Sequence, residues 1–137
     1  MAEFKGGCLC GAVRYASNAE PVFMANCHCD DCRKSSAAGH MSLIGLPKDQ
    51  VEFSGTLSEY QVTADSGASI SHHFCPSCGS QVYTASANTP VNAHIVAATL
   101  DDLSAFKPQA VVFASKAASW DQPFEGVPHF DKMPPTG

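Results

Sequence analysis

Basic residues are few in this chain and are not gathered in any segment. Only eight of its 137 residues are Lys or Arg, against thirteen Asp or Glu, and the formal net charge is −5. A protein that holds a phosphate backbone usually shows a concentrated patch or run of basic residues. Nucleic acid is therefore not expected as a partner.

Long apolar runs are also missing. No stretch approaches the roughly 18 apolar residues that a membrane-spanning helix requires, and the first residues include no apolar segment of signal-peptide length. We therefore expect a cytoplasmic protein that does not associate with membranes. In a reducing compartment, clustered cysteines serve more often as metal ligands or redox groups than as a disulfide framework.

Helical patterning is scarce, and short alternating or apolar segments take its place. Gly, Ser, Asn and Pro separate the candidate strands, which are 12–15, 21–27, 41–46, 51–53, 57–63, 69–74, 81–85, 91–98 and 110–114. Short helical turns are expected through 32–36, capped by Asp30 or Asp31, and at 101–103. The sequence thus predicts one mainly-β domain, with a loosely held tail over 131–137 that has little to bury.

The most informative residues that the chain does contain are its clustered cysteines. Its seven cysteines fall into three clusters: Cys8 and Cys10; Cys27, Cys29 and Cys32; Cys75 and Cys78. An odd number cannot pair completely as disulfides, and such clusters can present several thiolates to one metal ion. An all-sulfur environment favours zinc over magnesium or calcium, although the residues alone do not exclude iron. Seven sulfurs divide into one complete tetrahedral site and one site that is a ligand short.

The first and last clusters both have spacings that suit a shared ion. The last is a Cys-x-x-Cys pair followed by Gly79, which can take the positive φ that such a turn often needs. The first is a Cys-x-Cys pair. On extended backbone its two sulfurs would face the same way, and Leu9 between them is expected to point toward the core.

The middle cluster combines both spacings within six residues. Cys27, Cys29 and Cys32 could therefore bind one ion, with His28 facing away from it by alternation. Three protein ligands and one exchangeable position are typical of catalytic zinc, where the ion acts as a Lewis acid or activates a bound water or thiol.

Alternatives remain open for the middle cluster and its surroundings. It could be a second closed structural site whose fourth ligand is a histidine, such as His40, His72 or His73. A redox role for the Cys-x-x-Cys pairs is disfavoured because the surrounding pattern is not βαβ.

Two further features near the motifs are also open to more than one interpretation. Arg33 and Lys34 directly follow the last ligand of the middle cluster. Three roles are open for them: partial neutralisation of the thiolate charge, contact with a substrate carboxylate, or a place on a solvated helix face. Trp120, the only tryptophan, either lines a pocket or belongs to the core, and the core is the expected place.

Three longer motifs surround the cysteines, at 6–15, 27–36 and 74–80. They read Gly-Gly-Cys-Leu-Cys-Gly-Ala-Val-Arg-Tyr, Cys-His-Cys-Asp-Asp-Cys-Arg-Lys-Ser-Ser and Phe-Cys-Pro-Ser-Cys-Gly-Ser. In this order, and with the stretches 116–120 and 126–130, they resemble the glutathione-dependent formaldehyde-activating enzyme family, which includes centromere protein V. The resemblance spans nearly the whole chain. One departure is Ala-Ala-Gly-His at 37–40, because family members usually carry Gly sooner after the Arg-Lys-Ser-Ser segment.

The resemblance implies a β-tent fold of short antiparallel sheets with zinc knuckles, formed by residues 1–130 as a single zinc-binding domain. It also implies two zinc ions per chain. Cys8, Cys10, Cys75 and Cys78 would hold a structural ion, whereas Cys27, Cys29 and Cys32 would hold the second ion with one position open.

The activity that the resemblance implies joins glutathione and formaldehyde, as in S-(hydroxymethyl)glutathione synthase. The chain would then be a zinc-dependent carbon–sulfur lyase that handles a small thiol adduct, with glutathione as co-substrate. The glutathione sulfur would take the open zinc position as a thiolate and later add to the carbonyl carbon. The competing hypothesis is a non-enzymatic interaction module that two zinc ions merely fold.

Overall fold

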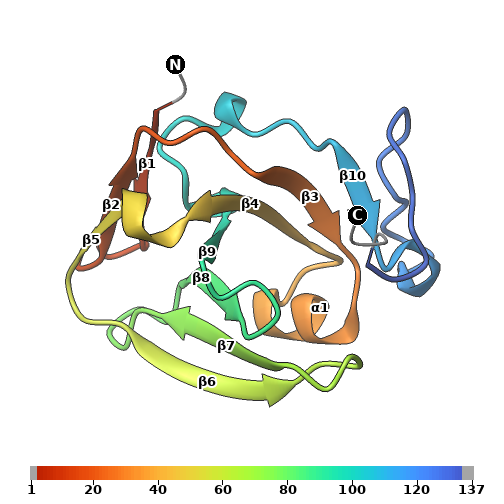
Figure 1. Cartoon of the computed structure of the whole chain (residues 1–137), viewed down its shortest axis with the longest axis horizontal. Helices are drawn as coiled ribbons and strands as arrows, with labels where there is room; N and C mark the ends of the chain where they lie inside the picture. The colour runs from red at the N-terminus through yellow and green to blue at the C-terminus, as the bar shows by residue number, and fades with distance from the viewer. Residues whose placement is uncertain (1–2, 134–137) are drawn as a thin grey trace.

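Two β-sheets form the structure, a computed structural model that describes residues 3–133 (Figure 1). The smaller sheet has the order β1-β2-β5, with β1 Phe4–Gly7, β2 Arg14–Ser17 and β5 Val51–Ser54. The larger has the order β10-β3-β4-β9-β8-β7-β6. Its strands are β3 Phe23–Cys27, β4 Met41–Pro47, β6 Ser58–Thr63, β7 Ser69–Phe74, β8 Gln81–Ser86, β9 Asn92–Val96 and β10 Ala110–Val112. All strand pairs are antiparallel except β10 with β3.

Helical structure is limited to short elements, as expected. The helix α1 spans Asp30–Ser36, and single 3₁₀ turns occur at Lys48–Gln50 (η1), Ala97–Thr99 (η2), Leu103–Ala105 (η3) and Ala114–Lys116 (η4). Cys29, and not Asp30 or Asp31, is the N-cap of α1, because its sulfur accepts a hydrogen bond from the Cys32 amide. No helix within residues 3–133 is long and apolar enough to cross a membrane.

The mainly-β prediction is confirmed. Each predicted strand overlaps an observed one, and β7 has the predicted bounds. β1 was not predicted because its sequence ends in two glycines, which are poor strand formers. It forms because Phe4 is 1% exposed and because all four residues of β1 pair with β2.

The core has two parts, and the smaller one adjoins the middle cysteine cluster. The larger part contains Phe4, Ile44, Leu46 and Ile95 among its most buried side chains. The smaller part consists of Cys27, Cys32, Met41, Leu43, Val96 and Val112, where β3, β4, β9, β10 and α1 meet. Burying an aliphatic side chain of this size contributes about 1.5–3 kcal/mol. The ends of β3 and β4 therefore form a packed support for α1.

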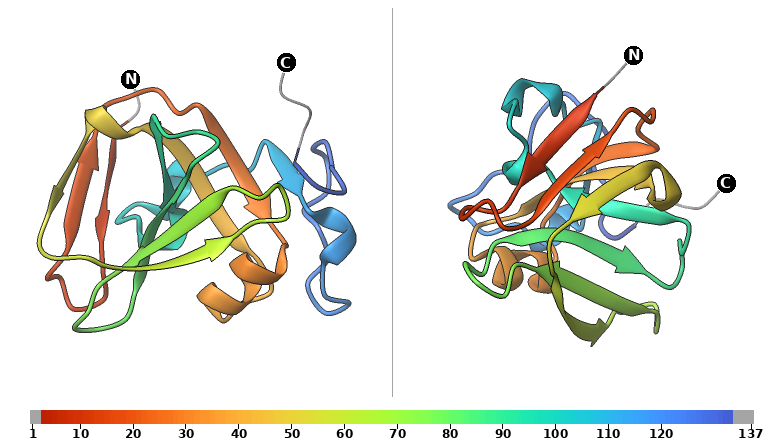
Figure 2. Two further views of the ribbon diagram at one scale, coloured as in Figure 1. Left: turned by 60° about the horizontal axis from the view of Figure 1, so that its bottom comes forward. Right: turned by 90° about the vertical axis from the view of Figure 1, so that its left-hand side faces the viewer.

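The segment after β10 folds back beside that strand, at the end of the molecule opposite the small sheet (Figure 1). The Phe130 amide donates to the Val111 carbonyl at 2.8 Å, and the Val111 amide donates to the Pro128 carbonyl at 2.9 Å. β3 runs toward α1 near this segment (Figure 2, left). The return brings side chains of the 113–130 region close to the point where β3 ends.

Two predictions about side-chain burial are wrong. Leu9 is 89% exposed, because it lies in a turn closed by the hydrogen bond from the Gly11 amide to the Cys8 carbonyl, where strand alternation does not hold. Trp120 is 74% exposed, because it lies in a turn closed by the Asp121 amide and the Ala118 carbonyl, outside both parts of the core.

The sequence Ala-Ala-Gly-His at 37–40, where the chain departs from the family motif, affects how α1 ends. Ala37 ends α1 in the left-handed conformation, with φ 56° and ψ 33°, which favours glycine. We expect Ala37→Gly to raise the free energy of unfolding by about 0.5–1 kcal/mol, since the relieved strain exceeds the added chain entropy. Thermal unfolding of the variant and the wild type measures this difference in stability. The matched variant Ala38→Gly, at a neighbouring position without positive φ, should lower the free energy of unfolding. If both variants changed stability by the same amount, the strain at Ala37 would not be the cause.

Candidate functional site

The first and last cysteine clusters meet in space. The sulfur atoms of Cys8, Cys10, Cys75 and Cys78 lie within 4.8 Å of one another. The Cys8 and Cys10 sulfurs are 3.6 Å apart, and the Cys10 and Cys75 sulfurs are 3.7 Å apart. In a tetrahedral zinc site with bonds of about 2.3 Å, the sulfurs are about 3.8 Å apart. All seven cysteines are free of disulfide bonds, so this donor set fits one zinc ion.

Backbone turns hold these four sulfurs in place. The Gly79 amide donates to the Cys75 carbonyl at 2.8 Å, and Gly79 has a φ of 80°, as its position after the pair predicted. The Val13 amide donates to the Cys8 sulfur at 3.2 Å. A hydrogen bond from the Ser80 hydroxyl helps to lower the pKa of Cys78 to about 5. The contacts from Val13 and Ser80 thus favour thiolate, the form that binds metal, at Cys8 and Cys78.

The middle cysteine cluster lies at the junction of β3 and α1. Cys27 ends β3, Cys29 caps α1, and Cys32 lies in its first turn, with the three sulfurs within 4.8 Å of one another. Cys27 and Cys32 are buried, whereas Cys29 is partly exposed. Within residues 3–133, no fourth Cys, His, Asp or Glu shares this spacing with all three.

The three middle thiols compete for negative charge. Hydrogen bonds from the Cys27 and Cys32 thiols lower the pKa of Cys29. The pKa of Cys32 is raised, first by its hydrogen bond to Cys27 and then by that to Cys29 and by burial. One thiolate therefore forms readily, whereas two more require a cation among the sulfurs.

The histidines that could have closed this site lie elsewhere. His40 is 2.6 Å from Asp121, measured from Nδ1 to Oδ2. The His73 ring stacks on Tyr83, with ring centroids 4.1 Å apart. His72 is buried and its Nδ1 has no hydrogen-bond partner among the described residues, yet it does not join the sulfur group. The geometry therefore does not favour a closed site at the middle cluster with one of these three histidines as its fourth ligand.

His72 nevertheless lies near the middle cluster. Burial lowers its pKa, while the nearby charges of Asp31 and Cys29 act in the opposite direction. The sequence marked His72 as one of three candidate fourth ligands, without indicating which of them would approach the cluster. Its approach to Cys29 depends on how β7 lies relative to α1, which local patterning does not predict.

Arg33 and Lys34 lie on α1 but differ in their contacts. The Arg33 guanidinium is 3.1 Å from an Asp30 carboxylate oxygen, and Lys116 also approaches Asp30, at 3.6 Å. Lys34 is exposed and makes no ion pair within residues 3–133. Of the two candidate substrate contacts, only Lys34 is free of an existing partner there.

A third group of possible ligands was not predicted. His28, His40 and Asp121 bring their ligand atoms within 4.8 Å of one another. His28 does not join the neighbouring sulfur group, in agreement with the expected alternation. Asp121 is far from both histidines in sequence, and no motif indicates that the returning C-terminal segment brings it there.

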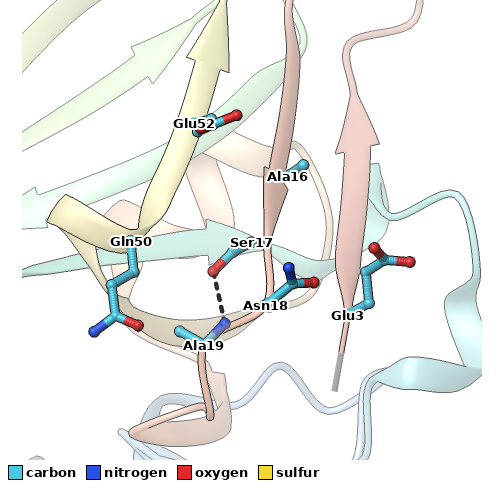
Figure 3. A pocket seen from close by; sticks show the side chains of 7 residues that line it. All are labelled: Glu3, Ala16, Ser17, Asn18, Ala19, Gln50 and Glu52. Atoms are coloured by element: carbon cyan, nitrogen blue, oxygen red, sulfur yellow. Dashed lines mark hydrogen bonds between the residues drawn. The ribbon is translucent and has the colours of Figure 1, made fainter. Parts of the chain in front are cut away.

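One hollow of the surface is separate from the cysteine sites. That hollow has a volume of about 290 Å³ and is lined by Glu3, Ala16, Ser17, Asn18, Ala19, Gln50 and Glu52 (Figure 3). It contains no cysteine or histidine, and its Ser17 hydroxyl already accepts a hydrogen bond from the Ala19 amide at 3.1 Å. The cysteine and histidine groups described above therefore lie outside this hollow.

Comparisons with known proteins agree with the motifs. The family model described as glutathione-dependent formaldehyde-activating enzyme matches residues 3–116. A protein named as an uncharacterized lyase, from Schizosaccharomyces pombe, is 28% identical over 88 residues, which cover 64% of this chain and only 61% of that protein. The crystal structure of a Rhodobacter sphaeroides protein has the same fold, with a TM-score of 0.60 at 20% identity over 91% of this chain and 98% of the other. The chain belongs to the glutathione-dependent formaldehyde-activating enzyme family.

Proposed function

We propose that the chain is a zinc-dependent carbon–sulfur lyase that joins a small thiol, glutathione in the first instance, to formaldehyde. The observation that carries this proposal is the middle cluster, where three sulfurs gather with no fourth protein ligand among residues 3–133. Family membership supports the thiol and the aldehyde as substrates. The lyase name of the Schizosaccharomyces pombe relative supports the reaction class.

In this proposal the seven cysteines have two different roles. Cys8, Cys10, Cys75 and Cys78 hold a structural zinc ion, which their sulfur spacing supports. Cys27, Cys29 and Cys32 hold the working ion. Bound there, zinc supplies an exchangeable coordination position and lowers the pKa of a thiol that occupies it.

The chain's own residues would position the reactants. The substrate thiol loses its proton, its sulfur adds to the formaldehyde carbon, and the carbonyl oxygen takes up a proton to give the hydroxymethyl adduct. The exposed Lys34 ammonium is a suitable contact for a glutathione carboxylate. Arg33 is a second candidate, but it would first have to leave Asp30.

The direct test is the rate at which the adduct forms. Full-length zinc-loaded protein is added to glutathione and ¹³C-formaldehyde, and exchange NMR measures the interconversion of free aldehyde and S-hydroxymethylglutathione. The proposal expects exchange to be faster than the uncatalysed rate and to depend linearly on protein concentration. An unchanged rate, together with stoichiometric zinc, would instead favour the non-enzymatic scaffold.

A further inference from the structure

Two histidines lie just beyond the paired ends of β3 and β4. Cys27 pairs with Met41 in the register of these strands, and both residues belong to the smaller part of the core. The next residues outward are His28 and His40, whose rings are 4.8 Å apart. Because the His28 amide still hydrogen-bonds the Val112 carbonyl at 3.1 Å, the alternation of β3 continues and turns His28 away from the middle cysteine cluster.

A carboxylate from the returning C-terminal segment completes the group. Asp121 Oδ2 lies 2.6 Å from His40 Nδ1 and 3.7 Å from His28 Nδ1. Nitrogen and oxygen ligands of one tetrahedral ion, with bonds of about 2.0–2.1 Å, are about 3.3 Å apart. The two measured distances lie on either side of this value, so small side-chain movements would bring all three atoms to a common ion.

His28 is the residue whose state requires explanation. Its side chain is 1% exposed, and neither ring nitrogen has a hydrogen-bond partner among the described residues. Burying polar atoms without partners is unfavourable, so such atoms in a folded protein usually indicate an absent water, ion or ligand. Here one unsatisfied nitrogen is directed toward the Asp121 carboxylate, which a cation would bridge to it.

The backbone leaves room for that carboxylate. A Cβ atom at Gly39 would collide with the Asp121 carboxylate group. Glycine is therefore the residue that allows Asp121 to lie beside His40. The absence of a side chain at Gly39 is an observation separate from the histidine contacts, and it concerns the same group of His28, His40 and Asp121.

We propose that His28, His40 and Asp121 form a third cation site, separate from both cysteine sites, for a first-row divalent ion such as zinc, cobalt or iron(II). Two imidazoles and one carboxylate suit ions of this class better than magnesium or calcium. The ion replaces the hydrogen between His40 and Asp121, and the ring hydrogen of His40 moves to Nε2. Because the side chains of His40 and Asp121 are 29% and 24% exposed, the remaining coordination positions face solvent.

The test separates this site from the cysteines. The full chain is first loaded with cadmium, which occupies thiolate sites, and cobalt(II) is then titrated by calorimetry and visible spectroscopy. We expect one cobalt ion per chain, without the sulfur-to-cobalt charge-transfer absorption of a thiolate site. His40→Ala and Asp121→Asn should each weaken binding at least about 10-fold, since losing a ligand costs no less than losing an outer-shell partner. The charge-matched control Asp65→Asn, in an exposed turn, should bind as the wild type does.

Several results would overturn the third site. They are no cobalt uptake by the cadmium-loaded wild type, sulfur charge-transfer bands in the bound cobalt, or equal affinity in the wild type and both variants. The outcome does not depend on the proposed lyase activity, because that activity is measured by adduct exchange and this site by the difference in bound cobalt between variants. Circular dichroism of each variant confirms that the fold is retained, and the nearly isosteric Asp121→Asn serves if His40→Ala does not fold.

Discussion

Replacing Cys78 by alanine is expected to unfold most of the protein. The substitution leaves the buried thiols of Cys8 and Cys75 and the exposed thiol of Cys10 without the fourth sulfur that their spacing implies. Cys8 and Cys75 also belong to the larger part of the core, so loss of the ion would disturb its packing. Structural zinc contributes about 10–16 kcal/mol in small zinc domains, whereas a whole domain is stable by only about 5–15 kcal/mol. We expect a loss of about 5 kcal/mol or more.

Circular dichroism and thermal melting in the presence of zinc measure this loss. Ser77→Ala, at the middle of the same turn, is the matched control and should melt close to the wild type. A Cys78→Ala protein with wild-type melting and undiminished zinc content would show that these four sulfurs do not hold a structural ion.

Replacing Cys29 by alanine is expected to have the opposite pattern, with the fold retained and activity lost. Cys29 is the most exposed of the three middle cysteines, and as the N-cap of α1 its sulfur accepts a hydrogen bond from the Cys32 amide at 3.3 Å. Loss of that N-cap should cost about 1 kcal/mol. The proposed working ion, however, loses one of three ligands. Adduct exchange should then slow by at least about 10-fold, and one zinc ion per chain should be lost.

The comparison variant for Cys29→Ala is Ser35→Ala, on the same helix, which should keep both the zinc ion and the exchange rate. If Cys29→Ala unfolds as completely as Cys78→Ala, the two clusters have the same structural role. That result would favour the non-enzymatic scaffold. If it folds and retains full activity, the middle cluster is not the site of the reaction.

Much of the local arrangement of the cysteines could be predicted from the sequence because the signals are local. The positive φ of Gly79 follows from its place after a Cys-x-x-Cys turn, and the three middle sulfurs gather because only two residues separate β3 from α1. The meeting of Cys8 and Cys10 with Cys75 and Cys78 was implied by family resemblance and could not follow from spacing. It requires the β1–β2 turn to lie against the β7–β8 turn, a long-range contact.

The wrong prediction for Leu9 and the missed histidine–aspartate group depend on structure that local sequence patterns do not record. Leu9 was predicted to be buried on the assumption of extended backbone, but a turn replaces the strand there. The group of His28, His40 and Asp121 joins parts of the chain about eighty residues apart, through a return beside β10 that has little strand patterning. Such packing is a property of the whole fold, so no single segment records it.

The most direct test of the unequal division of sulfurs is zinc-edge anomalous diffraction from crystals of the full chain. The account predicts one ion bound by Cys8, Cys10, Cys75 and Cys78. It predicts a second bound by Cys27, Cys29 and Cys32, with a water or an added thiol as its fourth ligand. Disulfide bonds in place of ions, or a protein histidine in the fourth position of the second ion, would contradict it.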